Sequence, residues 1–133
     1  LEDYLGFYYP WHRGEGAGKL EPRLKELVRL RIATLNGCKT CKAARLDPSI
    51  SEKEAMQSVD DPDHPFTERE RAALAFAETM AVDHFAIDDD YVRGLKRHFS
   101  DSELLELMMM TGQYIGFGRM LAVLQLEETV CPI

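Results

Sequence analysis

Cysteine is scarce in this sequence: Cys38, Cys41 and Cys131 are the three that occur among its 133 residues. A small, odd number of cysteines excludes the disulfide framework of small secreted domains. The chain also lacks any apolar run near the roughly 18 residues that a membrane-spanning helix needs. Its net charge of −7 argues against nucleic acid and anionic membranes as partners. We therefore expect a cytoplasmic protein that binds neither.

Strand-like alternation of apolar and polar residues is missing as well. Helical spacing and helix-capping pairs are present instead, so the fold class is predicted to be all-α, a compact bundle of five to six helices. At this length the chain can form one domain, residues 1–133, with a substantial core. The predicted helices cover residues 20–35, 38–47, 51–59, 67–84, 88–99 and 101–126.

The two ends of the chain carry unusual patterns. Residues 1–19 are rich in aromatics and glycine and lack a helical period after Pro10, which predicts an arm laid on this subunit or a neighbour. The helix over 101–126 is apolar on more than one face, which favours a central or intersubunit position. Gly112 and Gly116 share one of its faces. They indicate either close approach of a backbone or ligand, or a tolerated weak spot.

The chemistry-bearing stretch is Cys38-Lys39-Thr40-Cys41, directly after the helix-ending pair Asn36-Gly37. Two thiols three residues apart at a helix start can cycle between dithiol and disulfide, because amides and nearby lysines favour a thiolate. Zinc uses the same spacing, but it needs four ligands, and the remaining candidates are Cys131 and a histidine. Two merely structural buried thiols are the other alternative.

Glu26 is the acidic candidate near this pair. A chain that folds back at Asn36-Gly37 brings Glu26 near residue 47, within about one helical turn. Arg45 lies within that turn and four residues after Cys41, on the same helical face. A row of Glu26, Arg45 and Cys41 is therefore predicted, and the alternative for Glu26 is a solvated surface carboxylate.

The pattern Glu26-x11-Cys38-x2-Cys41, with Leu35-Asn36-Gly37 before the cysteines, resembles the carboxymuconolactone decarboxylase superfamily. It is most similar to the alkylhydroperoxidase D-like branch, and residues 66–78 and 99–107 resemble the same family. The resemblance implies an all-helical fold that assembles into dimers, trimers or hexamers. It also implies a redox-active pair that reduces hydroperoxides and is re-reduced by a dithiol or thioredoxin-like partner. We expect no cofactor and no metal.

The resemblance carries residue roles with it. It implies that Cys41 attacks the peroxide, that Cys38 resolves the product, and that Glu26 belongs to a glutamate–histidine proton relay. The cysteine roles could be reversed, because the helix dipole favours ionising Cys38. The relay histidine should stand four residues after the second cysteine, where this chain has Arg45. An arginine cannot exchange its proton near neutral pH, so the site is predicted to be charged but without the usual shuttle.

His84 is the candidate replacement proton donor, because it falls on the apolar face of the helix predicted over 67–84. A satisfied core histidine is the alternative reading of that position. His12 and His64 are expected in loops and His98 at a helix end, and none receives a role.

The predicted function is a thiol-dependent peroxidase or disulfide reductase in antioxidant defence. The alternative is a non-enzymatic helical oligomer with a redox-sensing or structural cysteine pair. Lactone decarboxylation, which does not depend on the cysteines, and a zinc site rank below these two.

Overall fold

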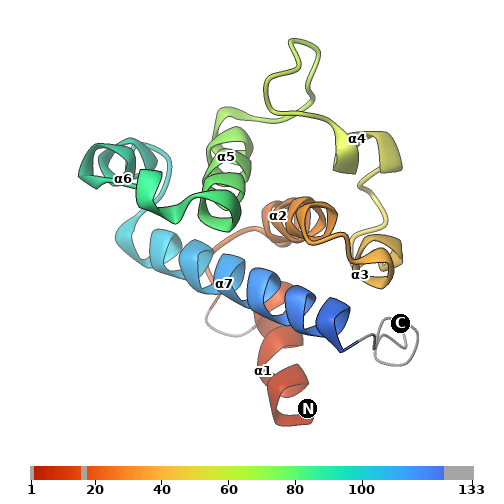
Figure 1. Cartoon of the computed structure of the whole chain (residues 1–133). Coiled ribbons are helices and arrows are strands. Elements are labelled where there is room, and N and C mark those ends of the chain that lie inside the picture. The colour runs from red at the N-terminus through yellow and green to blue at the C-terminus, as the bar shows by residue number, and fades with distance from the viewer. Residues whose placement is uncertain (1, 16–17, 125–133) are drawn as a thin grey trace.

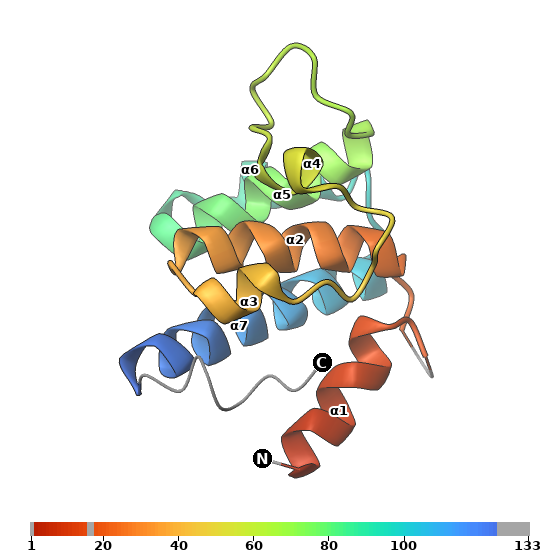
Figure 2. The ribbon, with the colours of Figure 1, turned by 90° about the vertical axis from the view of Figure 1, so that its right-hand side faces the viewer.

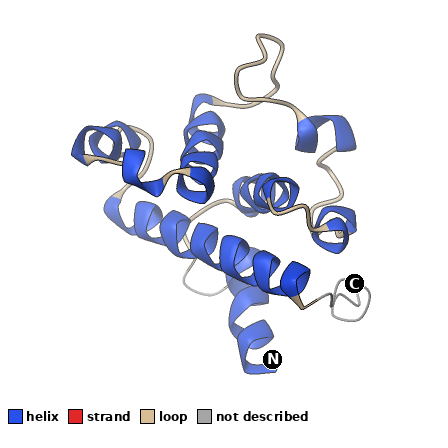
Figure 3. Ribbon diagram, in the orientation of Figure 1, coloured by secondary structure: helices blue, strands red, loops and turns tan. Residues whose placement is uncertain are grey.

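The computed structural model describes residues 2–15 and 18–124, and within them every regular element is a helix (Figures 1 and 3). The predicted all-α class is confirmed. The helices are α1 (Glu2–His12), α2 (Pro22–Leu35), α3 (Lys39–Ala43), α4 (Glu52–Met56), α5 (Glu68–Val82), the 3-10 helix η1 (His84–Ala86), α6 (Asp89–Leu95) and α7 (Asp101–Val123). None of these helices is long and apolar enough to cross a membrane.

Helix α2 is the centre of the fold. It packs against α5, α7, α3 and α4, and Figures 1 and 2 show these helices arranged around it. Every residue from Leu24 to Ala33 is buried, so this helix has no solvent face over nearly three turns. The sequence predicts a central or intersubunit position for the last helix, and α2 rather than α7 is central within the chain. Part of α7 is instead exposed, with Leu105 61% and Met109 42% accessible.

The predicted helix starts are confirmed by their caps. Thr67 and Glu70 form a capping box at the start of α5, and Ser100 and Glu103 form another at α7. Ser51 caps α4 through its hydroxyl, which accepts from the backbone amide of Glu54. These starts depend on residues three apart, which is why the sequence locates them well.

The turn after α2 is also as predicted. Gly37 has a φ of +67°, the left-handed conformation that ends a helix at low steric cost. Asn36 keeps a right-handed conformation, and its side-chain amide donates to the carbonyls of Tyr114 and Ile115 on α7. A Cβ at Gly118 would lie 2.6 Å from the Asn36 amide nitrogen, so this glycine permits the close approach of α2 and α7. Beyond the neighbouring residues and backbone of α7 itself, no described atom lies within 4 Å of a Cβ placed at Gly112 or Gly116.

The N-terminal arm packs on the body of this subunit, as predicted, but most of it is a helix, which was not predicted. Helix α1 continues past Pro10 to His12, which raises the number of α-helices in the described residues above the expected five or six. A proline removes one backbone hydrogen bond, and here tertiary contacts compensate for it. Tyr8 and Trp11 pack against the core, and the ammonium of Lys25 donates to the carbonyl of Trp11 in the last turn.

Candidate active site

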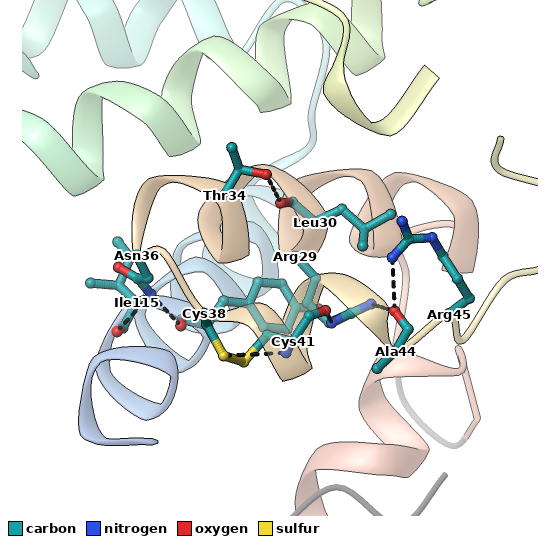
Figure 4. The surroundings of a disulfide bond; sticks show 10 residues. Arg29, Leu30, Thr34, Asn36, Cys38, Cys41, Ala44, Arg45 and Ile115 are labelled. Atoms are coloured by element: carbon teal, nitrogen blue, oxygen red, sulfur yellow. Dashed lines mark hydrogen bonds between the residues drawn. A yellow bond between two sulfur atoms is a disulfide. The ribbon is translucent and has the colours of Figure 1, made fainter. Parts of the chain in front are cut away.

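A disulfide joins Cys38 and Cys41 at the start of α3, with the two Cα atoms 5.3 Å apart (Figure 4). Cys38 is the N-cap of α3, and its sulfur accepts from the backbone amide of Cys41 at 3.2 Å. The two cysteines differ in exposure, because Cys38 is fully buried while Cys41 is half-buried. Cys41 is therefore the cysteine that a molecule arriving from solvent reaches first.

Cys41 borders a cavity of about 220 Å³ between α1, α2 and α7. The cavity wall is largely apolar and aromatic, and it includes the following side chains: Leu5, Tyr8 and Tyr9 of α1, Ala33 of α2, and Tyr114, Phe117 and Leu121 of α7. Arg29 and Arg13 also border it. An apolar cavity with a few polar groups is the usual form of a small-molecule site.

Glu26 lies behind this cavity with no exposed surface. Its carboxylate accepts two hydrogen bonds from Arg29, at 2.7 and 2.8 Å, and one from the backbone amide of Leu46 at 3.0 Å. The last contact confirms the predicted fold-back, which placed Glu26 near residue 47. The alternative of a solvated carboxylate is wrong.

His12 supplies the next contact of Glu26, with Nε2 3.0 Å from Oε2. Burial alone raises the pKa of Glu26, but the hydrogen bonds from Arg29 and His12 outweigh burial and hold that pKa at about 2. Glu26 is therefore ionised at neutral pH. Burial lowers the pKa of His12 below its ordinary value of 6.5, more than the carboxylate raises it.

Tyr114 completes the line of polar groups, because its hydroxyl lies 2.8 Å from His12 Nδ1. The ring of Tyr114 borders the cavity, whereas the imidazole of His12 is 2% exposed. Burial raises the pKa of Tyr114 well above 10. The tyrosine is thus protonated at neutral pH. Because Nε2 of His12 faces the ionised Glu26 carboxylate and carries the ring hydrogen, Nδ1 of the neutral imidazole accepts from the Tyr114 hydroxyl.

Arg29 connects Glu26 to the cysteines. Its guanidinium donates to the carbonyl of Cys41 at 2.7 Å and to the carbonyl of Ala44 at 2.6 Å, as Figure 4 shows. Sequence reasoning missed this residue, although Arg29 follows Glu26 by three positions on one helix, the spacing at which side chains meet. The guanidinium fixes both the carboxylate and the cysteine-bearing segment.

The predicted contact between Arg45 and Glu26 is wrong. The guanidinium of Arg45 pairs with Glu52 and donates to the carbonyl of Ala44, and Figure 4 shows it away from the sulfurs. The prediction required a helix running on to residue 47, but α3 ends at Ala43 and Ala44 is extended. Arg45 therefore does not share a helical face with Cys41. Arg29 occupies the position that was assigned to Arg45.

The prediction for His84 fails for a similar reason. Helix α5 ends at Val82, because Asp83 leaves the helical conformation. His84 then lies in η1, exposed, with its ring against that of Phe85. His12, which was expected in a loop, is the buried histidine of the site. The aromatic richness of residues 1–19 was the one signal in the sequence that this segment packs on the body.

The described residues contain no group of three or more histidine, cysteine, aspartate or glutamate side chains arranged to hold a metal ion. Cys131, the further ligand considered for zinc, lies outside the described residues.

No protein-family model and no curated protein sequence matches the chain. A solved structure does match it, that of a protein of unknown function from Agrobacterium tumefaciens, described as a candidate antioxidant defence protein AhpD. The match covers 99% of this chain and 90% of that one, with a TM-score of 0.74 and 24% identity. At this identity the likeness establishes the fold alone. The chain thus has an AhpD-like, all-helical fold.

Proposed function

We propose that this chain is a thiol-dependent peroxidase or disulfide reductase of the carboxymuconolactone decarboxylase superfamily, acting in antioxidant defence. The observation that carries the proposal is the position of the Cys38–Cys41 pair. Cys41 borders an apolar cavity, and a buried carboxylate–guanidinium pair holds the segment that bears this cysteine. An apolar wall suits an organic hydroperoxide, and the half-buried Cys41 leaves the disulfide accessible to a dithiol or thioredoxin-like reductant.

The proposed cycle assigns different roles to the two cysteines. The thiolate of Cys41 attacks the distal oxygen of the hydroperoxide, which gives a sulfenic acid on Cys41 and releases an alkoxide that takes up a proton. The thiol of Cys38 then condenses with the sulfenic acid, forming the disulfide and water. A dithiol reductant returns both cysteines to thiols and is itself oxidised. The greater exposure of Cys41 supports this order of roles.

Arg29 and Glu26 serve this cycle by position and charge. Arg29 fixes the carbonyls of Cys41 and Ala44, so it holds the α3 segment in place. Its positive charge at the edge of the cavity favours a thiolate at Cys41. Glu26 orients that guanidinium and the imidazole of His12.

Stopped-flow oxidation of the reduced protein by tert-butyl hydroperoxide tests the proposal. Replacing Cys41 by serine should abolish oxidation, whereas Cys38→Ser should allow one oxidation event that stops at the sulfenic acid. Cys131→Ser is the matched control and should react as the wild type does. Equal oxidation rates in the wild type and in both site variants would overturn the proposal.

A non-enzymatic redox sensor makes a different prediction. It would form the disulfide once and show no turnover when a dithiol reductant is supplied. Turnover of hydroperoxide with dithiothreitol as the reductant therefore separates the two functions.

We also propose that the protein is a homo-oligomer, a dimer, trimer or hexamer, formed through α7. Several large apolar side chains of this helix are exposed in the single chain: Leu105, Met109, Met120 and Val123. With Gly112 and Gly116 they recur at the three- and four-residue spacing of a helical face. An exposed apolar stripe of this kind is typical of an interface.

A further inference from the structure

We propose that Tyr114 and His12 form the proton path between the cavity and Glu26, in place of the histidine that the family resemblance puts at position 45. This inference rests on the proposed dithiol function. It assigns a role to a histidine from the N-terminal helix and to a tyrosine from the last helix, 102 positions apart in the chain.

The three groups form a continuous line of hydrogen bonds. The Tyr114 hydroxyl lies 2.8 Å from Nδ1 of His12, and Nε2 of the same ring lies 3.0 Å from the Glu26 carboxylate. Tyr114 borders the cavity that Cys41 also borders, whereas His12 and Glu26 are buried behind it. A proton that enters the line at Tyr114 therefore reaches the imidazole without passing through solvent.

The groups that surround Tyr114, His12 and Glu26 determine where the protons lie before the reaction starts. Glu26 accepts from Arg29 and from the Leu46 amide, so it is ionised, and Nε2 of His12 carries a hydrogen toward it. Nδ1 is then an acceptor, and the Tyr114 hydroxyl donates to it. Because burial keeps the phenol protonated and the imidazole neutral, the line at rest can accept one proton.

The path serves the cycle in both directions. In the first step the Cys41 thiol gives its proton to the Tyr114 oxygen while the Tyr114 proton passes to Nδ1, leaving a thiolate and an imidazolium beside Glu26. The thiolate then attacks the hydroperoxide, and the O–O bond breaks to release an alkoxide. Tyr114 donates to that alkoxide and recovers its proton from Nδ1. The net change is a thiol and a hydroperoxide converted to a sulfenic acid and an alcohol.

The charged groups around His12 allow its imidazole to hold an extra proton for a short time. Glu26 favours the imidazolium, while Arg29 and Lys25 of the same helix disfavour it. Two phenols of α1, Tyr4 and Tyr8, also face the pair, and Arg13 borders the same cavity as Tyr114. An imidazolium stabilised by one carboxylate and opposed by two cations can form and then return its proton, as a relay requires.

Two substitutions test the path, each with a matched control far from the cavity. Tyr114→Phe removes one hydroxyl, and His12→Gln keeps a polar side chain that cannot carry the proton. The controls are Tyr91→Phe, which removes a hydroxyl on α6 that contacts Thr79, and His64→Gln in the loop before α5. Circular dichroism and disulfide formation check that each variant folds.

The leaving group provides a readout that a structural defect would not imitate. With tert-butyl hydroperoxide the leaving alkoxide needs a proton, and we expect both site variants to oxidise about 100-fold more slowly than wild type. With peracetic acid the leaving acetate needs none, so the loss should shrink to a few-fold. The pH dependence of thiol alkylation by iodoacetamide should shift to higher pH in both variants, because the thiol loses its proton acceptor.

The outcomes separate this inference from the proposed function. If the wild type turns over and Tyr114→Phe and His12→Gln match the controls with both oxidants, the path is overturned while the dithiol function stands. Equal losses with both oxidants and an unchanged alkylation profile also overturn it, because together they indicate a positional defect. If the wild type does not react with hydroperoxides, the proposed function fails. The alkylation profiles then decide the path, and unchanged profiles reject it.

Discussion

Arg29 and Glu26 form a buried pair one turn apart on α2, joined by hydrogen bonds of 2.7 and 2.8 Å. The same guanidinium holds the backbone carbonyls of Cys41 and Ala44. One side chain therefore links the charge at the centre of the fold to the segment that carries the disulfide. A single substitution of Arg29 therefore removes four hydrogen bonds at once.

Replacing Arg29 by methionine should lower the free energy of unfolding by about 3–5 kcal/mol, because it leaves the carboxylate of Glu26 buried with one fewer charged partner. Urea unfolding measures this. Arg93→Met is the control, because Arg93 and its partner Asp90 are both exposed and such a pair contributes about 1 kcal/mol or less. A loss at Arg29 as small as that at Arg93 would contradict the prediction.

Acid should weaken the fold through Glu26. Its pKa is about 2 in the folded protein against an ordinary value of 4.5, so the folded state holds the proton less strongly than the unfolded chain. The stability that Glu26 contributes is complete above pH 4.5 and is lost as the pH falls from there toward 2. Urea unfolding at a series of pH values should show a decline in this window that is smaller in Glu26→Gln.

His12 should add an earlier decline. Its folded pKa lies below the ordinary value of 6.5, so its contribution to stability is complete above pH 6.5 and is lost as the pH falls below that value. His12→Gln should therefore flatten the stability curve as the pH falls below 6.5. His64→Gln, in a loop, is the control. An unchanged curve in His12→Gln would show that the imidazole is not held neutral in the folded state.

A second buried ion pair should hold α1 in place. Lys25 and Glu106 lie 2.8 Å apart with 1% and 3% exposure, and Lys25 also donates to the Trp11 carbonyl at the end of α1. Lys25→Met should lower the free energy of unfolding by about 3–5 kcal/mol. The double variant with Glu106→Leu should recover part of this loss, so a double-mutant cycle should give a coupling energy of about 1 kcal/mol or more. Additive losses would contradict the pairing.

Substitution of Arg45 should leave the redox chemistry unchanged. The sequence suggests that Arg45→His would restore a missing proton relay and raise turnover. In the structure the side chain at this position turns to Glu52, and Glu26 already has His12 and Arg29 as partners. We therefore expect peroxidase turnover within about threefold of wild type in Arg45→His and in Arg45→Ala, a change of less than about 1 kcal/mol in the barrier. A large rise in Arg45→His would reinstate the first expectation.

The exposed face of α7 should control assembly. Leu105→Glu and Met109→Glu place charges in the proposed interface, so the purified protein should shift to the mass of a single chain in light scattering. Val82→Glu is a control, since Val82 is an exposed apolar residue on α5 and lies outside this stripe. An unchanged mass in the α7 variants would mean that the chain assembles through another surface or not at all.

The sequence by itself determined the features that depend on neighbours along the chain. The all-α class, the caps at Thr67 and Ser100, the left-handed Gly37 and the closeness of the two cysteines all follow from spacings of a few residues. The approach of Glu26 to Leu46 also follows, because one tight bend fixes the pairing of the two segments on either side of it.

Only the tertiary structure decided how the candidate site is completed. The extended backbone of Ala44 turns Arg45 away from Glu26. No local sequence pattern predicts that the five-residue helix α3 ends at Ala43. The helical arm places His12 against Glu26 and Tyr114, groups 14 and 102 positions away, and this contact exists because burial of aromatic side chains docks α1 on the core. Such packing depends on surfaces formed by segments that are distant in the sequence. The spacing of residues a few positions apart does not predict these surfaces.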